Sequence, residues 1–372
     1  MMISFIIKII FSNLLLFPLL GLIFFNFIEP NSIALFRVCS VIVVFIFNLF
    51  LIFLFKDKFT NQNDFKNFKF FLIVFLISSV FFFFRVLVIE PCGGWDAWAM
   101  WNAKAKDFTN LFLNEKPYKM FKETWAHPGY PTLIPLQIAF LSVNIGFFTE
   151  YVSYFLNYTY LILFFLMMMD IYSSSKNKNG VVNYIFVIPF SLIFLIHQSS
   201  DLYADYFLSI LYTFIFYLYF KNKENLNSLN LTIIFFLSSC LFLIKNEGAF
   251  LFLSILFFLL LNHKINFLKF SFPALIGIIL PLSLFLYYKI NSPEFNPVPI
   301  TIDHLKNSLT DFQRYKNVLF ALIFFHGVVM YFTITILIYH FRKMKIHFLN
   351  YLFPLLIVHI IYNGIFLVTS SD

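Results

Sequence analysis

Residues 90–133 contain most of the side chains in this sequence whose types and spacing could do chemistry. Asp96 lies next to Trp95 and close to Trp98. A carboxylate in such an aromatic setting at a membrane face would be partly desolvated and therefore more basic, which suits a general base that activates a hydroxyl. Aspartate is also a favoured helix N-cap, and this alternative stays open because capping and catalysis are compatible.

Basic residues follow Asp96 in the same segment. Lys104 and Lys106 could contact a phosphate headgroup; a solvated helix face or ordinary contact with anionic lipid is the alternative. His127 precedes a Pro-Gly-Tyr-Pro turn that includes Tyr130. The imidazole could donate to phosphate or bond to the backbone of the turn. These three basic residues are candidate contacts to the phosphate of a donor, and Tyr130 is a candidate wall of a substrate groove.

Three tryptophans, Trp95, Trp98 and Trp101, recur at a spacing of three, which places them on one side of a helix. Indole rings favour the membrane–water interface, where the ring is in apolar surroundings and the N–H is in water. We therefore expect a short helix over 95–107 that lies on the membrane surface and borders the substrate groove. Asp96 would lie at its start, where the helix dipole favours a carboxylate.

Two further groups of charged residues lie at the ends of apolar runs. Asp201 and Asp205 are four residues apart and would share a helix face, so that one could be a second acid and the other a cap. Lys245 and Glu247 lie in a tight break between two apolar runs. They could neutralise each other, or the lysine could bind a phosphate that the glutamate helps to orient.

The composition indicates what kind of protein must position these residues. Of the 372 residues, 61% are hydrophobic and 12% are charged, whereas soluble proteins carry about 25% charged residues. The mean hydropathy is +0.85, and apolar runs of roughly 20 residues recur along the chain. The sequence therefore predicts an all-α polytopic membrane protein that forms a single transmembrane domain.

Several function classes are disfavoured by the same sequence. The net charge of +8 does not indicate a nucleic-acid partner, because most basic residues lie in short loops, as expected for cytoplasmic loops of membrane proteins. There is no P-loop, G-x-G-x-x-G, H-E-x-x-H or C-x-x-C motif. We assign no metal ligand and no certain cofactor, although two acids and a phosphate could hold a divalent cation.

The topology depends on whether 132–147 crosses the membrane. If it does not, all five basic loops share one side, as the positive-inside rule favours. We therefore expect 132–147 to be a juxtamembrane or re-entrant helix on the outer face, within an outer catalytic loop over 90–148. About eleven spans remain, with the N-terminus inside: 5–27, 32–55, 70–89, 150–170, 182–197, 204–220, 230–244, 248–262, 272–290, 318–340 and 348–368.

The ordered motifs resemble those of integral-membrane glycosyltransferases of the GT-C fold. This class includes the protein O-mannosyltransferases, the aminoarabinose transferase of lipid A and a set of bacterial relatives. The resemblance covers roughly residues 70–260 and rests on GGWDAWAMWNAKAK, HPGYPTLIPL, LYADYFLS and IKNEGAF in that order. The chain has two additional spans before the motif loop. It also stops at Asp372, just after a span, so we expect the C-terminal part to be divergent or shortened.

The resemblance implies an inverting transferase that takes a sugar from a polyprenyl-phosphate donor. The acceptor would be a glycan, lipid or protein on the outer face of a bacterial inner (plasma) membrane. Asp96 matches the acid of the first outer loop and Asp205 the second acid, while Lys245 and Glu247 match the K-N-E-G position. In this interpretation Lys245, together with Lys104, Lys106 or His127, would stabilise the departing lipid phosphate.

Two other functions stay open. A transporter or flippase of a lipid-linked glycan would place ionisable groups and broken helices near the bilayer midplane, often with internal symmetry. A non-enzymatic membrane component of a polysaccharide assembly complex would leave Asp96 and Asp205 without a role. The sequence favours the transferase, because its notable charges gather at the expected outer edge and it contains no visible repeat.

Overall fold

The computed structural model describes residues 42, 46, 68–89, 93–94, 97–113, 130–174, 199–202, 204–223, 226–262, 267–291, 310–313 and 316. The chain divides into two compact units. Unit 1 comprises Met1–Val181, Leu192–Tyr217 and Asn291–Pro293, and unit 2 comprises Val182–Ser191, Leu218–Ile290 and Glu294–Asp372. The described residues form eight α-helices and no strand, which confirms the predicted all-α class.

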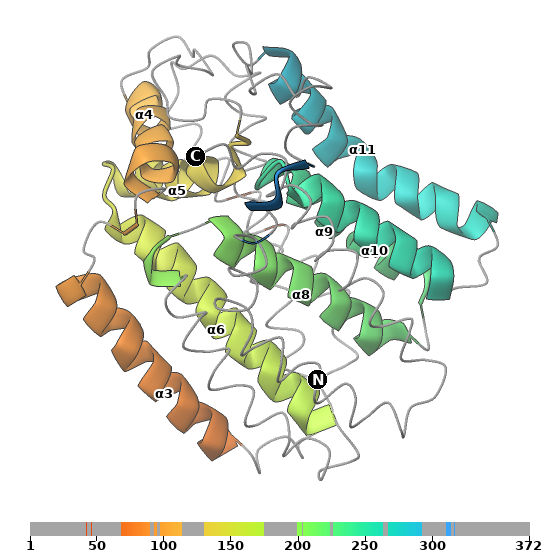
Figure 1. Cartoon of the computed structure of the whole chain (residues 1–372), viewed down its shortest axis with the longest axis horizontal. Coiled ribbons are helices and arrows are strands. Elements are labelled where there is room, and N and C mark those ends of the chain that lie inside the picture. The colour runs from red at the N-terminus through yellow and green to blue at the C-terminus, as the bar shows by residue number, and fades with distance from the viewer. Residues whose placement is uncertain are drawn as a thin grey trace. The chain divides into compact units, whose positions relative to one another are not determined.

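The described part of unit 1 has three long helices with two shorter ones at one end (Figure 1). Its helical elements are α3 (Phe68–Phe84) with the π-helical η4 (Arg85–Ile89), η5 (Ala97–Trp101) with α4 (Asn102–Leu113), α5 (Leu133–Ile145), α6 (Tyr151–Ser174) and α8, which starts at Ala204. The α8 helix ends at Asn222, so its last turn belongs to unit 2.

The α3 and α6 helices run in opposite directions. The rings of Phe75 and Phe165 lie 5.3 Å apart, and those of Phe82 and Tyr158 also lie 5.3 Å apart. A later residue of α3 therefore contacts an earlier residue of α6, as in an antiparallel pair of helices. The Tyr158 hydroxyl donates to Ser79 Oγ at 2.8 Å and links the same two helices. The chain between α3 and α6 therefore returns to the end of unit 1 at which α3 finishes.

The α6 and α8 helices run in the same direction. The ring of Tyr160 lies 4.3 Å from that of Phe207 near one end. Near the other end, the Tyr217 hydroxyl donates to Asp170 Oδ2 at 2.6 Å. Asp170 and Tyr217 are both buried, and a buried carboxylate needs a hydrogen-bond donor of this kind. The starts of α6 and α8 and the end of α3 consequently lie together.

The α4 and α5 helices pack on each other, and α5 also packs on α6. The 13 residues of α5 give a length of about 20 Å, which is short of a bilayer core of about 30 Å. Gly146 ends α5 with a φ of 105°, and its N–H donates to the carbonyl oxygen of Ser142. The prediction of a separate short helix within 132–147 is confirmed.

The helix expected over 95–107 is confirmed for the described residues, but the expectation that its tryptophans share one face is wrong for Trp98 and Trp101. The helical segment begins at Ala97, starts as a π-helix and extends to Leu113. Trp101 is 1% exposed whereas Trp98 is 53% exposed. A π-helix pairs residues i and i+5, so it has more residues per turn than an α-helix and rotates positions i and i+3 further apart. Trp98 and Trp101 therefore have different surroundings.

Unit 2 contains three helices that follow the end of α8: α9 (Ser228–Cys240) with the 3-10 turn η7 (Leu241–Leu243), α10 (Gly248–Asn262) and α11 (Phe267–Asn291). Asn227 caps α9, its side chain accepting from the N–H of Asn230. The predicted break between two apolar runs is confirmed as a turn at 244–247, where the Gly248 N–H donates to the carbonyl oxygen of Lys245 at 2.9 Å.

Glycine is required at position 248 because the chain folds back closely there. A Cβ atom at this position would lie 1.9 Å from the carbonyl oxygen of Leu241. We expect Gly248→Ala to lower the free energy of unfolding by about 1–3 kcal/mol or more, because backbone must move to admit the methyl group. Thermal unfolding of the purified protein in detergent measures this change. Leu253→Ala, at an exposed position of the same helix, should unfold close to wild type; equal midpoints for the two variants would contradict the expectation.

Helices cover six of the predicted spans, namely 70–89, 150–170, 204–220, 230–244, 248–262 and 272–290. The other predicted spans, 5–27, 32–55, 182–197, 318–340 and 348–368, lie wholly or almost wholly outside the described residues. Within the described part, one helical stretch, Tyr151–Asp170, is long and apolar enough to cross a membrane, which alone is weak evidence for a membrane protein.

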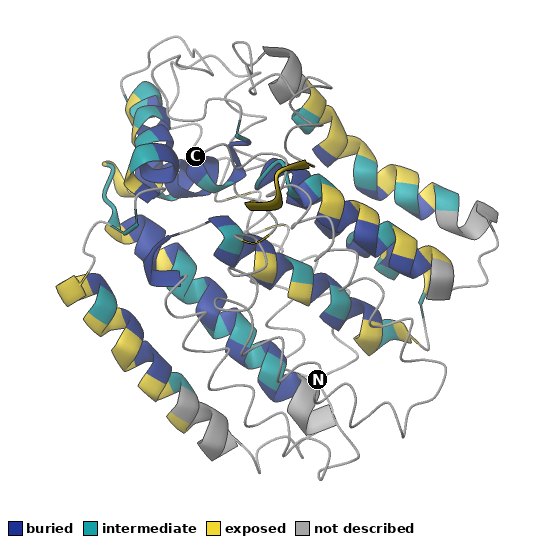
Figure 2. Cartoon of the chain, in the orientation of Figure 1, coloured by how far each residue is buried: buried dark blue, intermediate teal, exposed yellow. Residues whose placement is uncertain are grey.

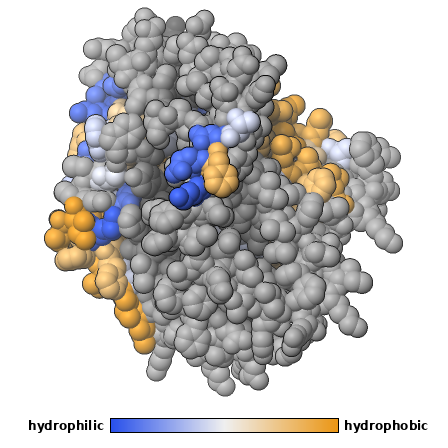
Figure 3. Space-filling model, viewed as in Figure 1, coloured by the Kyte–Doolittle hydropathy of each residue, from blue (hydrophilic) through white to orange (hydrophobic). Residues whose placement is uncertain are grey.

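The surfaces of α3 and α11 are strongly apolar. Figure 2 shows exposed residues along both helices, and Figure 3 shows hydrophobic side chains on them. On α3 the exposed residues include Ile73, Leu76, Ile77, Val80, Phe81 and Phe84, and on α11 they include Phe272, Leu275, Ile276 and Ile279. Each unit therefore has a described helix on which large apolar side chains are exposed.

Candidate functional site

An ion pair joins the end of α3 to the segment before α8. The Nη2 and Nε atoms of Arg85 donate to Asp201 Oδ1 at 2.8 and 3.2 Å. The Asp201 side chain is 4% exposed and that of Arg85 is 19% exposed. Two donors on one carboxylate oxygen, in a largely buried place, make a charge-assisted contact with defined geometry.

The same segment holds the glycine pair that precedes Asp96 in the sequence. The Gly94 N–H donates to the carbonyl oxygen of Asp201 at 2.9 Å, and the Ala97 N–H donates to the carbonyl oxygen of Gly94 at 3.0 Å. Gly94 and Ala97 are the described residues on either side of 95–96. Gly94 is therefore bonded to Asp201, and Ala97 is bonded to Gly94.

Gly93 and Leu202, which are the neighbours of Gly94 and Asp201 in the chain, both have a positive φ. Gly93 has a φ of 73° and Leu202 a φ of 60°. A positive φ is uncommon for leucine and costs about 1–3 kcal/mol, and such residues cluster at functional sites. A Cβ at position 93 would lie 2.9 Å from the Cβ of Ala97 and 3.2 Å from the carbonyl oxygen of Asp201, so glycine permits the close approach. We name the contacts of Asp201 and Leu202 with Arg85, Gly93, Gly94 and Ala97 the loop clamp.

Three of the predicted site residues, Trp101, Lys104 and Tyr130, lie together in unit 1. The Lys104 ammonium is fully buried and donates to the carbonyl oxygen of Tyr130 at 3.3 Å. The ring of Trp101 meets that of Tyr130 edge to face, with centroids 6.1 Å apart. Buried lysines are costly unless their charge is satisfied, so this contact ties the turn at Tyr130 to the start of α4.

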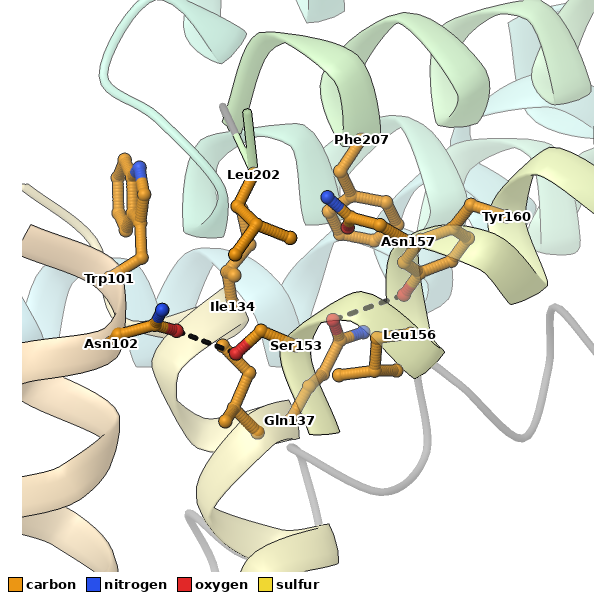
Figure 4. A pocket seen from close by; sticks show the side chains of 11 residues that line it. Trp101, Asn102, Ile134, Gln137, Ser153, Leu156, Asn157, Tyr160, Leu202 and Phe207 are labelled. Atoms are coloured by element: carbon orange, nitrogen blue, oxygen red, sulfur yellow. Dashed lines mark hydrogen bonds between the residues drawn. The ribbon is translucent and has the colours of Figure 1, made fainter. Parts of the chain in front are cut away.

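A pocket of neutral polar and aromatic side chains lies among the starts of α4, α5, α6 and α8 (Figure 4). Its lining residues are Trp101, Asn102, Ile134, Gln137, Ile138, Ser153, Leu156, Asn157, Tyr160, Leu202 and Phe207. We name it the polar pocket. The volume of this cavity is about 10 Å³, which is about the space that one water molecule needs. None of these lining residues is charged.

Hydrogen bonds fix most of the polar lining. The Ser153 hydroxyl donates to Asn102 Oδ1 at 2.6 Å, and the Tyr160 hydroxyl donates to Gln137 Oε1 at 3.0 Å (Figure 4). Asn102 Nδ2 and Trp101 Nε1 are buried and have no hydrogen-bond acceptor among the described residues. Buried polar groups are nearly always paired, so two donors beside this pocket are available to an acceptor that enters it.

The polar pocket can therefore receive one small, neutral, hydrogen-bonding group such as a hydroxyl. A hydroxyl oxygen has two lone pairs for donors like Asn102 Nδ2 and a proton of its own to donate. The aromatic rings of Trp101 and Phe207 supply apolar walls. Amides, hydroxyls and aromatic rings without charge are a lining that suits part of a sugar.

Comparisons of this chain with protein-family models, curated proteins and solved structures find no match. The resemblance to the GT-C glycosyltransferases rests on the sequence motifs and stays a prediction.

Three predicted site residues, Asp96, Trp95 and His127, lie outside the described residues. Asp205 lies in the first turn of α8, half-buried, and its carbonyl oxygen accepts from the Ser209 hydroxyl. Of the two acids that share this region, Asp201 forms the buried ion pair. The role of Asp205 as a second catalytic acid stays a prediction.

The remaining predicted phosphate contacts lie in different places. Lys106 is exposed whereas Lys104 is buried, as expected for residues two apart on opposite sides of a helix. Only Lys106 of the two could meet a headgroup from outside without rearrangement. Lys245 and Glu247 lie at the turn before α10 in unit 2, both half-buried. Among the described residues, no group of three or more His, Cys, Asp or Glu could hold a metal ion.

Sequence reasoning missed Arg85 and the lining of the polar pocket. Arg85 had a signal, because it is the one charged residue in the apolar run 70–89, and charges within such runs mark functional sites. The residues of α6 that line the pocket were also recognisable from the sequence. Ser153, Asn157 and Tyr160 are polar and follow helical spacing within an apolar helix. Such a polar stripe indicates a face directed at other helices rather than at lipid.

Proposed function

We propose that this chain is a membrane glycosyltransferase of the GT-C type. It would transfer a sugar from a polyprenyl-phosphate donor, with inversion, to an acceptor on the outer face of a bacterial inner membrane. The observation that supports this proposal is the loop clamp, in which Gly94, two residues before Asp96, bonds to Asp201, more than 100 residues later in the chain.

The apolar surfaces of α3 and α11 support a membrane location with about eleven spans. Exposed patches of this kind on soluble proteins are rarely larger than a few hundred Å², whereas lipid covers them in a bilayer. The opposite directions of α3 and α6 support an outer loop in which α5 does not cross. The region around the loop clamp would then lie at the outer ends of α3, α6 and α8.

The residues near the loop clamp have the chemistry that such a transfer needs. Asp96 would accept the proton of the acceptor hydroxyl as it attacks the anomeric carbon, and the carbon–oxygen bond to the lipid phosphate would break. The polar pocket would hold a hydroxyl of the sugar through Asn102 and its neighbours. The departing phosphate would be stabilised by cations, for which Lys106 is the candidate in the described part of unit 1. His127 and Lys245 stay candidates from the sequence motifs alone.

Transfer of radiolabelled sugar from polyprenyl-phosphate donors into membrane lipids or glycans tests this function. We expect label to enter an acceptor in membranes that contain the chain and not in matched membranes without it. Absence of transfer from every donor tried, with well-folded protein, would contradict the proposal. It would favour a transporter of the lipid-linked glycan or a non-enzymatic assembly component.

A further inference from the structure

A second cavity, larger and more open than the polar pocket, lies between α4 and the loop that joins α5 to α6. Its volume is about 720 Å³, within the range of pockets that hold small organic ligands. Its lining residues are Lys106, Asn110, Leu113, Gly146, Phe147, Phe148, Thr149, Glu150 and Tyr151. We name this cavity the outer cleft.

The outer cleft continues the polar pocket along one face of α4. Asn102, Lys106, Asn110 and Leu113 follow the i, i+4, i+8, i+11 spacing of one helix face. Asn102 lines the polar pocket, and the other three line the outer cleft. Lys106 lies about 6 Å beyond Asn102 along the helix axis.

The first turn of α6 contributes to both cavities. Tyr151, which is exposed, lines the outer cleft, and Ser153, which is buried, lines the polar pocket. The Ser153 hydroxyl donates to Asn102 Oδ1 at 2.6 Å, so α6 is joined to α4 one turn before Lys106. A ligand in the outer cleft would therefore have one end next to the polar pocket.

The lining of the outer cleft indicates the chemistry of its ligand. It contains one cation, Lys106, and one anion, Glu150, so it does not select a strongly charged ligand of either sign. Its other polar groups are an amide and hydroxyls that can both donate and accept. Phe147 and Tyr151 are 58% and 70% exposed and present aromatic rings to any ligand there. Polyhydroxylated rings with apolar C–H faces match all three features.

We propose that the outer cleft is the acceptor subsite and binds a neutral oligosaccharide, the glycan portion of the acceptor. This inference rests on the proposed function, since it names the acceptor of that reaction. The acceptor chain would lie along α4, and its terminal hydroxyl would reach the junction with the polar pocket. The polar pocket would hold one hydroxyl of the donor sugar, so that the two substrates meet beside Asn102 and Ser153.

Equilibrium binding of defined neutral oligosaccharides to the full-length protein in nanodiscs tests the subsite without requiring transfer. A set of maltotriose, mannotriose, chitotriose and a galactose-based trisaccharide provides the probes, and saturation-transfer NMR provides the readout. We expect at least one probe to bind. Tyr151→Ala and Asn110→Leu should each weaken it about tenfold, which corresponds to a loss of about 1.4 kcal/mol. Phe155→Ala, at an exposed position of α6 outside the cleft, should bind as wild type does.

Two results would overturn the acceptor subsite. One is that no probe binds, or that Tyr151→Ala and Asn110→Leu bind it as wild type does. The other is that inorganic phosphate binds, is lost in Lys106→Met and is not displaced by any oligosaccharide, which would assign the cleft to a headgroup. In the transfer assay, Tyr151→Ala should raise the KM for acceptor and leave the KM for donor unchanged. Glycan binding without any transfer would contradict the proposed function and retain the glycan site.

Discussion

Asp96→Asn is expected to abolish sugar transfer while the protein keeps its fold. Asparagine has the size of aspartate and a similar side-chain oxygen, but its amide cannot take a proton from an acceptor hydroxyl. General-base catalysis contributes about 10²–10⁴-fold to a rate, so kcat should fall by at least about 100-fold. Because the loop clamp joins backbone and side-chain groups at 85, 94 and 201, it does not depend on the Asp96 carboxylate.

The transfer assay with saturating donor measures kcat, and thermal unfolding in detergent measures the fold. Asp107→Asn provides a matched control, because it makes the same isosteric change to the next acid in the chain. Full activity in Asp96→Asn would remove this residue from the mechanism. Loss of activity together with an equal loss of thermal stability would indicate a structural role instead.

Arg85→Met is expected to destabilise unit 1 strongly. It leaves the Asp201 carboxylate 4% exposed without its arginine, and breaking a buried ion pair from one side costs about 3–5 kcal/mol. Asp201→Asn leaves the guanidinium without its charge partner and should also destabilise, by less because Arg85 is 19% exposed. Transfer should fall in both variants, because the Asp96 stretch is held through Asp201.

The double variant Arg85→Met/Asp201→Asn tests whether the two side chains stabilise the protein as a pair or independently of each other. If the contact acts as a pair, the double variant should be more stable than Arg85→Met alone, since no unpaired charge stays buried. Its transfer rate should stay low because the clamp is still missing. Lys106→Met, which removes an exposed cation of the same unit, should unfold close to wild type. Additive losses in the double variant would contradict a coupled pair.

Much of the fold could be predicted from the sequence because its helices coincide with long, uniform apolar runs. The predicted spans over 150–170 and 248–262 agree with α6 and α10 to within a few residues. The break at Lys245–Gly248 was also predictable, since charged residues and a glycine interrupt an apolar run there. Such features depend on local composition, which a single sequence shows directly.

The candidate site could be predicted only in part, because its contacts join distant segments. Nothing local shows that Arg85 pairs with Asp201 rather than Asp205, since both acids lie on the same short stretch. The π-helical start of η5, which separates Trp98 from Trp101, changes a spacing rule that holds for α-helices. The burial of Lys104 likewise depends on Tyr130, 26 residues later.

The ion pair between Arg85 and Asp201 also sets the order in which the chain can assemble. Its two residues are 116 positions apart, and synthesis at about 5–20 residues per second separates their emergence by roughly 6–23 s. During that interval the arginine just after α3 lacks the Asp201 carboxylate. In the membrane location proposed above, its guanidinium must then remain in water or among lipid headgroups, so α3 reaches its final depth only after the segment before α8 has been made. A nascent chain stalled before residue 199 would expose Arg85 to quality-control proteases.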